Sequence, residues 1–307
     1  MDPIASITPT KDSTLAMMLA VQSAGDRVWV MEQKDLYMQA GEARAQATAV
    51  VVQDTHADWF RISETRDRSL ADFATILMRK DPPFDMEFIY TTYLLELAEA
   101  AGTPVINKPA ALRDLNEKMA TALFPALTPA TLVTRSQDQL RTFLATHHHI
   151  VVKPLDGMGG RSIFTLQAGD KNANVVFETL TEYGTQFAMA QVYVPEITDG
   201  DKRVLMIDGT PVEYMLARVP DAADGRGNLV MGARADARPL GEVERRIAET
   251  VGPLLRERGV LFAGLDVIGD RLTEINVTSP TGIREIDRHF DVRIAERLYA
   301  AVVAKLT

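Results

Sequence analysis

The stretch "LFAGLDVIGDRLTEINVT" (residues 261–278) decides the fold, because it has the alternation of two β-strands joined by a short turn. A three-residue loop, Gly269 to Arg271, places Asp266 opposite Glu274 and leaves Asn276 on the same face, since side chains alternate along a strand. The same register gathers an apolar set on the opposite face: Leu265, Val267, Ile275 and Val277.

A shorter loop would change this face. A two-residue turn at Gly269-Asp270 would pair Asp266 with Thr273 and point Glu274 to the other side. Two independent patterns therefore favour the longer loop. Two carboxylates and an amide suit Mg²⁺, which takes few protein ligands and adds nucleotide phosphates. The alternative is an amphipathic hairpin whose acids only face solvent.

The glycine-rich stretch "KPLDGMGGRSI" (153–163) lies between two expected strands, 149–155 and 162–167. This placement excludes a P-loop or a dinucleotide-binding turn, because both of those lead from a strand into a helix. A glycine-rich hairpin loop either covers a phosphate with its backbone N–H groups or is a plain flexible turn. Lys153, at the end of the first strand, favours the phosphate.

Acids beside a phosphate repel it, so basic residues must lie close to the hairpin. Arg203 and Arg218 belong to a second expected hairpin, 202–219, and Lys118 to an expected helix, 115–125. The irregular segment 220–240 carries further arginines, Arg226 and Arg234. A loop of this length is usually functional or disordered, and the functional interpretation is a lid over a charged substrate.

The rest of the chain predicts a mixed α/β fold. Its first part alternates helices (11–25 and 86–102) with short strands (28–31, 48–52, 75–78 and 104–107), which indicates a parallel sheet. Further strands are expected at 130–134 and 187–194, and further helices at 137–146, 173–184 and 242–259, the last with a kink at Gly252-Pro253. We expect three domains: an N-terminal α/β domain (1–115), a small central α+β domain (116–192) and a C-terminal domain built on an antiparallel sheet (193–307).

Composition excludes several classes of partner and of chemistry. The chain has 307 residues, a formal net charge of −9 and no cysteine. The acidic balance argues against a nucleic-acid partner, and the lack of cysteine excludes disulfides and thiolate catalysis. We see neither a membrane-spanning run nor a secretory signal and expect a cytoplasmic protein.

Several motifs together resemble the bacterial glutathione synthetase family of ATP-grasp ligases. They are "KPLDGMGGRSIF", "GDKRVLMIDG", "GLDVIGDRLTEINVTSPTGIREI", "LMRKDPPFD" and "NKPAALRDLNEK". The resemblance implies an ATP-grasp fold, with ATP held between the central and C-terminal domains and Mg²⁺ or Mn²⁺ bridging its phosphates. It implies ligation of γ-glutamylcysteine to glycine through an acyl phosphate, and a cytoplasmic homotetramer.

The resemblance also implies roles for individual residues. Asp266, Glu274 and Asn276 match the metal ligands, and Arg203 and Arg218 lie where positive charge stabilises the reacting groups. Substrate contacts are implied for Arg79, Arg226, Ser279 and Thr281. Those implied for ATP are Lys118, Lys153, Asp156, Gly157, Gly159, Gly160, the adenine hinge Gln191, Val192, Tyr193 and Val194, and Asp201 at the ribose.

Departures from the family pattern affect some of these expectations. The family has a short strand before the equivalent of "MDPIA", so we expect a partly unfilled sheet and altered contacts near Asp2. Val192 replaces a frequent amide, Arg161 a small residue and Gly282 a larger one. Two alternatives stay open: another ATP-grasp carboxylate–amine ligase, such as a D-alanine–D-alanine or glutamate-adding enzyme, and a non-catalytic ATP-binding protein.

Overall fold

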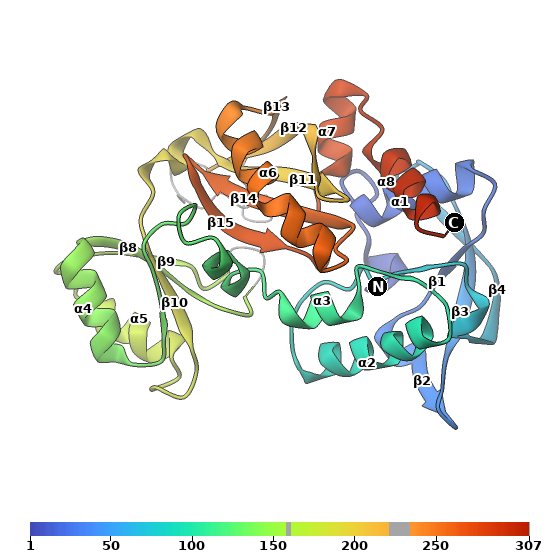
Figure 1. Ribbon diagram of the computed structural model, residues 1–307, viewed down its shortest axis with the longest axis horizontal. Coiled ribbons are helices and arrows are strands. Elements are labelled where there is room, and N and C mark those ends of the chain that lie inside the picture. Colours follow the sequence, from blue (N-terminus) through green and yellow to red (C-terminus); the bar gives the residue numbers. More distant parts are fainter. Residues whose placement is uncertain (158–160, 221–233, 307) are drawn as a thin grey trace.

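The computed structural model describes residues 1–157, 161–220 and 234–306. Helices and strands mix throughout, and the predicted α/β class is confirmed. Figure 1 shows a small lobe around β8–β10 at one end, the strands β11–β15 in the middle, and β1–β4 at the other end. In this described part, no helix is long and apolar enough to cross a membrane.

The central part of the molecule is a five-stranded antiparallel sheet in the order β13-β12-β11-β14-β15. Its strands are β11 (Asp201–Ile207), β12 (Thr210–Val219), β13 (Arg234–Pro239), β14 (Phe262–Ile268) and β15 (Arg271–Asn276). Three helices accompany it: α6 (Glu242–Glu257), α7 (Ile283–Phe290) and α8 (Ile294–Ala304). The segment 234–239, expected to be irregular, is therefore a strand, because it pairs with β12 along its whole length.

The β14–β15 hairpin has the predicted pairing but not the predicted loop. Asp266 lies opposite Glu274, as expected, while Ile268 pairs with Arg271 across a two-residue turn. A shift in register after Asp266 leaves Thr273 as an extra residue, and its hydroxyl donates to the Asp266 carbonyl at 3.0 Å. The three-residue loop was wrong, because a β-bulge restores the register that a two-residue turn alone would break.

A four-stranded antiparallel sheet in the order β7-β10-β8-β9 forms the small lobe. Its elements are β7 (Thr131–Thr134), α4 (Gln137–His147), β8 (His149–Pro154), β9 (Phe164–Gln167), α5 (Ala173–Leu180) and β10 (Ala188–Val192). These elements share a hydrophobic core of their own, drawn from residues 140–190. The glycine-rich stretch connects β8 to β9, as predicted.

The N-terminal part corrects one expectation. Its main sheet is antiparallel and holds β1 (Val28–Val30), β2 (Leu36–Gln39), β3 (Glu42–Val52) and β4 (Phe60–Ser69). Among the described residues the only parallel pair is β5 (Ile76–Leu77) with β6 (Val105–Ile106). The parallel sheet predicted through 28–31 and 48–52 was wrong: β2 and β3 are joined by the tight turn Ala40-Gly41, which only antiparallel strands can use.

Helices cover these N-terminal strands and lead into the site. They are α1 (Ser13–Ser23), capped by Asp12, α2 (Met86–Ala100) and α3 (Pro109–Asp114). The helix expected at 115–125 is shorter than predicted, a 3-10 helix over Met119–Leu123. The helix expected at 242–259 is confirmed as α6, which continues through Pro253 to Glu257, and the kink at Gly252-Pro253 stays a prediction.

Candidate functional site

A cavity of about 870 Å³ lies between the small lobe and the central sheet, and residues of β8, β10, β11, β12, β14 and β15 line it. It brings together most of the predicted site residues: Lys118, Lys153, Gly157, Gln191, Val192, Tyr193, Val194, Asp201, Arg203, Arg218, Asp266, Glu274, Asn276, Ser279 and Thr281. Asp156 and Arg79 are not among the lining residues. Gly159, Gly160 and Arg226 lie outside the described residues.

Asp266 is the most strongly paired acid of the cavity. Its Oδ1 lies 2.5 Å from Arg203 Nε, and its Oδ2 lies 2.9 Å from Arg218 Nη2. Asn276 adds a weaker contact, with Nδ2 at 3.3 Å from Asp266 Oδ2. Burial raises the pKa of Asp266, but Arg203 and Arg218 outweigh burial and bring the pKa below its ordinary value. Asp266 is therefore a carboxylate at neutral pH.

Glu274 faces two lysines instead of arginines. Its Oε1 lies 3.4 Å from Lys153 Nζ and 3.7 Å from Lys118 Nζ. Burial raises the pKa of Glu274, while Lys118 and Lys153 lower it further than burial raises it. Lys118 Nζ also donates to the Gly157 carbonyl at 2.7 Å, which ties the start of the glycine-rich loop to the carboxylates.

Glu117 lines the same cavity, and sequence reasoning missed it. It pairs with Lys118, and its backbone carbonyl accepts from Ile275 N at 2.8 Å. Burial, then the neighbouring Glu274 charge, raises the pKa of Glu117 to about 7. The available signal was its position directly before Lys118 in the motif "NKPAALRDLNEK", to which the resemblance assigned no role for Glu117.

Asp201 and Arg218 form a second ion pair in the wall of the cavity. Burial, with the nearby charges of Asp266 and Glu274, raises the pKa of Asp201 to about 7. Among the described residues, Asp201 Oδ1 and Arg218 Nε have no hydrogen-bond partner although both atoms are buried. Buried polar atoms without partners are rare in folded proteins, so this wall fits a polar ligand.

The expected adenine hinge follows β10. The Val192 N–H donates to the Ala130 carbonyl and the Tyr193 N–H to the His149 carbonyl, both at 3.0 Å. These two donors are therefore occupied within the sheet. The Tyr193 ring stacks on the His149 ring with 3.9 Å between their centroids, and both residues line the cavity. His149 was not predicted as a site residue, because a run of three histidines gave no reason to choose this one.

Arg79 lies behind the loop that carries Ser279 and Thr281. Its guanidinium is buried and donates to the Pro280 carbonyl at 3.0 Å and to Thr14 Oγ1 at 3.2 Å. Burial lowers the pKa of Arg79 to about 10, so it stays charged at neutral pH. Arg79 thus supports the loop of residues 279–281 from behind.

Comparison with known protein families matches nearly the whole chain. Residues 1–113 match the N-terminal domain of prokaryotic glutathione synthetase, and residues 117–291 match the ATP-grasp domain of the same enzymes. A glutathione synthetase of Pseudomonas syringae pv. tomato is 58% identical over all of this chain and 96% of its own length. One of Escherichia coli strain K12 is 55% identical over all of this chain and 97% of its own length.

Solved structures of similar fold are more distant in sequence. The ATP-grasp ligase PsnB, complexed with a minimal precursor, superimposes with a TM-score of 0.64 at 20% identity, over 96% of this chain and 95% of that one. The D-cycloserine synthetase DcsG gives a TM-score of 0.61 at 17% identity, over 78% of this chain and 86% of that one. These two structures establish the ATP-grasp fold. The family and sequence matches show that the chain belongs to the prokaryotic glutathione synthetase family.

Proposed function

We propose that the protein joins γ-glutamylcysteine to glycine at the expense of ATP, giving glutathione, ADP and phosphate. The observation that carries this proposal is the cavity in which Lys118, Lys153, Arg203 and Arg218 surround the carboxylates of Asp266 and Glu274. Such a site balances its own charge and still holds cations for an incoming polyphosphate. The high identity to glutathione synthetases supports the choice of substrates.

A divalent cation, Mg²⁺ or Mn²⁺, fits the residues on β14 and β15. Asp266, Glu274 and Asn276 offer oxygen ligands on one face of the hairpin, and oxygen is what these hard cations prefer. No cluster of three or more His, Cys, Asp or Glu residues suited to a metal occurs in the described ranges. Magnesium itself takes few protein ligands and completes its shell with phosphate and water. When bound, the cation would neutralise phosphate charge.

The chemistry of the chain itself is positioning and charge neutralisation. The acceptor carboxylate attacks the γ-phosphorus of ATP, ADP leaves, and the resulting acyl phosphate is attacked by the glycine amine, which releases phosphate and a proton. Lys153 and Lys118 face the Glu274 side of the cavity, while Arg203 and Arg218 face the Asp266 side. Cations fixed on both sides stabilise the negative charge that develops during each transfer.

Several assignments follow the same proposal. We place ATP between the central and C-terminal domains, with adenine near the hinge 191–194, the ribose near Asp201, and the phosphates near Lys118, Lys153 and the loop of Asp156, Gly157, Gly159 and Gly160. Arg226, Ser279 and Thr281 would meet the substrates, with Arg79 acting on them through Pro280. A cytoplasmic homotetramer is part of the proposal, in keeping with the need for ATP and with the family.

An ADP-release assay tests the proposal. ADP should form at full rate only with ATP, γ-glutamylcysteine and glycine together, and should fall to background when either acceptor is omitted. D-Alanine and glutamate serve as controls in place of the two acceptors. Turnover with those controls would indicate another carboxylate–amine ligase, and ATP binding without turnover on any acid would indicate a binding protein.

A further inference from the structure

Asp81 differs from every other acid of the cavity, because within the described residues its carboxylate has no ion pair and no hydrogen bond. Four further acids line the cavity, and each of them pairs with a cation. These pairs are Glu117 with Lys118, Asp201 with Arg218, Asp266 with Arg203 and Arg218, and Glu274 with Lys118 and Lys153.

The main chain of Asp81 is fixed on both sides. Its N–H donates to Asp2 Oδ2 at 2.8 Å, and its carbonyl accepts from Lys80 Nζ at 2.7 Å. Lys80 Nζ also pairs with Asp2 Oδ1 at 2.7 Å, so the charge of Lys80 is already neutralised. The half-buried carboxylate of Asp81 is thus held at the wall of the cavity without a cation of its own.

The contacts of Arg79 place Asp81 beside the loop of residues 279–281. Arg79 lies two positions before Asp81 and donates to the Pro280 carbonyl at 3.0 Å and to Thr14 Oγ1 at 3.2 Å. Burial lowers the pKa of Arg79, and the charges of Asp12 and Asp81 oppose this effect. Arg79 therefore senses Asp81 through space, but its guanidinium is buried behind the loop and makes no ion pair with it.

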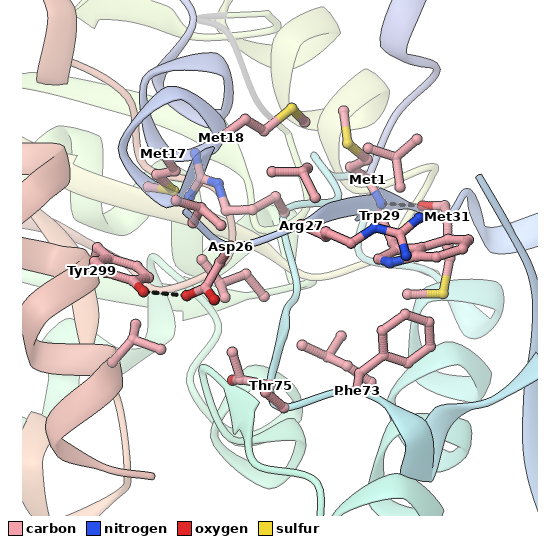
Figure 2. Close-up of a pocket in the computed structure, with 18 of the residues that line it drawn as sticks. Met1, Met17, Met18, Asp26, Arg27, Trp29, Met31, Phe73, Thr75 and Tyr299 are labelled. Carbon is pink, nitrogen blue, oxygen red and sulfur yellow. Dashed lines mark hydrogen bonds between the residues drawn. The ribbon is translucent and has the colours of Figure 1, made fainter. Parts of the chain in front are cut away.

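A second large pocket, in the N-terminal part, offers no comparable acid. The acids that line it are Asp26 and Asp72. Asp26 accepts a hydrogen bond from the Tyr299 hydroxyl, as Figure 2 shows, and Asp72 pairs with Arg68 at 3.7 Å. A carboxylate without a partner is therefore not a general feature of the pockets of this protein, and the one at Asp81 calls for a ligand.

The proposed function supplies a cation for this place. γ-Glutamylcysteine carries an α-ammonium group that takes no part in the reaction and keeps its charge. A cation that leaves water needs an opposite charge, and of the acids described in the cavity only Asp81 can provide one without breaking an ion pair. Glycine also arrives as an ammonium ion, but its nitrogen must lose a proton before it attacks, and a carboxylate beside it would favour the charged form.

We propose that Asp81 binds the α-ammonium of γ-glutamylcysteine and thereby selects an acceptor that carries this group. The inference rests on the proposed function and adds to it the residue that recognises the far end of the acceptor. It also places the γ-glutamyl end beside Pro82 and the loop of residues 279–281, which line the cavity with Asp81.

The test compares two acceptors by steady-state ADP release. N-Glutarylcysteine keeps both carboxylates and the thiol of γ-glutamylcysteine and lacks only the α-ammonium. In the wild type, kcat/KM should be about 10- to 100-fold lower for glutarylcysteine, because a site built around a charged hydrogen bond rejects an analogue that lacks the partner. Asp81→Asn should lower kcat/KM for γ-glutamylcysteine by about the same factor, mainly through KM, and should not lower it for glutarylcysteine.

Asp58→Asn is the matched control, because Asp58 is an exposed acid of the β3–β4 loop outside the cavity. It should leave both values of kcat/KM unchanged, and Asp81→Asn should leave KM for ATP and for glycine within about twofold. An equal fall for both acceptors in Asp81→Asn, an unchanged preference for γ-glutamylcysteine, or a rise in KM for glycine alone would each overturn the proposal.

The wild type alone provides a test that needs no variant. Equal use of the two acceptors would show that the ammonium is not recognised and would overturn the proposal. If the wild type formed no ADP with either acceptor, the proposed function would fall and this inference with it. Turnover of γ-glutamylcysteine with an unchanged preference in Asp81→Asn would overturn this inference alone.

Discussion

The guanidinium of Arg203 and the carboxylate of Asp266 face each other across β11 and β14 as direct cross-strand partners. Their two contacts, Nε to Oδ1 at 2.5 Å and Nη2 to Oδ2 at 3.0 Å, form a bidentate pair that is almost wholly buried. Arg203 Nη1 also donates to the Thr281 carbonyl at 3.3 Å. One planar side chain thus fixes the orientation of the carboxylate and ties the hairpin to the loop that carries Thr281.

Replacing Arg203 by lysine tests whether the reaction needs the bidentate geometry of arginine or only its positive charge. Lysine keeps the positive charge but has no planar fork, so Asp266 and the Thr281 carbonyl lose their shared donor. We expect kcat to fall about 100-fold. The fold should persist, because Arg218 still pairs with Asp266. Steady-state ADP kinetics and circular dichroism measure the two effects.

The control for this variant is Arg245→Lys on the exposed side of α6. It makes the same chemical change away from the cavity and should leave kcat and KM unchanged. Wild-type kcat in Arg203→Lys would show that the bidentate geometry has no part in the reaction.

Glu274→Gln tests the carboxylate that faces Lys118 and Lys153. Glutamine keeps the size of the side chain and removes its charge, so the proposed cation loses one ligand charge and Lys153 loses its ion-pair partner, while Lys118 keeps Glu117. ADP formation should fall about 100- to 1000-fold, and the Mg²⁺ concentration for half-maximal rate should rise.

The matched control is Glu249→Gln, an exposed position of α6. Its rate and Mg²⁺ dependence should equal those of the wild type. If Glu274→Gln turned over almost normally, the metal assignment would be wrong. If the rate fell while its Mg²⁺ dependence stayed unchanged, Glu274 would not be a metal ligand, and its role would be limited to pairing with the lysines.

The C-terminal site was largely predictable because it depends on local alternation. Once Asp266 pairs with Glu274, the period of two along the strands places Asp266, Glu274 and Asn276 on one face, and that pairing was predicted correctly. The loop itself was not predictable, since the bulge at Thr273 depends on a hydrogen bond to Asp266 that leaves no mark in the spacing.

The N-terminal part was less predictable for a physical reason. β4 carries the sequence "FRISETRDRS", which is charged and mostly exposed, so it lacks the apolar alternation that indicates a strand. Without β4 and β2, the segments that became β1 and β3 looked like isolated short strands in a chain that also holds the helices 11–25 and 86–102. Glu117 and His149 were missed because burial and stacking arise only after distant segments meet.

Asp201 should make stability depend on pH. Its pKa rises from 3.8 to about 7 on folding, mainly because it is buried. The folded protein therefore holds a proton that the unfolded chain releases, and the stabilisation from this proton is complete below pH 3.8 and is lost as pH rises to about 7. Asp201→Asn should remove this part of the decline, measured by urea unfolding from pH 4 to 8 without nucleotide.

Asp199→Asn is the control for the pH measurement, because Asp199 is exposed and Arg238 holds its pKa below the ordinary value. Its effect on stability should not show a decline between pH 4 and 7. An unchanged pH profile in Asp201→Asn would show that Asp201 is ionised throughout this range in the folded protein.

The buried amide of Asn107 joins the N-terminal part to the central sheet. Its Nδ2 donates to the Phe262 and Val277 carbonyls at 2.7 and 2.6 Å, and its Oδ1 accepts from Leu261 and Phe262 N–H at 2.8 and 2.9 Å. Asn107→Ala leaves these backbone groups buried without partners and should lower the free energy of unfolding by about 3 kcal/mol. Urea denaturation measures it, and Asn174→Ala on exposed α5 should stay within about 0.5 kcal/mol of wild type.

Gly252 and Gly209 allow α6 to contact the β11–β12 turn directly. A Cβ added to Gly252 would lie 2.1 Å from the Gly209 carbonyl oxygen, and one added to Gly209 would lie 2.5 Å from the Gly252 oxygen. The turn is held in place, since Arg256 Nε donates to the Asp208 carbonyl at 3.0 Å and Asp208 N to the Leu261 carbonyl at 2.7 Å. Gly252→Ala must therefore push α6 off the sheet, although alanine favours a helix by about 1 kcal/mol.

We expect Gly252→Ala to cause a net loss of about 2 kcal/mol in the free energy of unfolding, whereas Glu249→Ala in the same helix should be neutral within about 0.5 kcal/mol. Thermal and urea unfolding measure this loss. If Gly252→Ala instead stabilised the protein, helix propensity would outweigh the close contact, and the β11–β12 turn would have moved to accept the added Cβ.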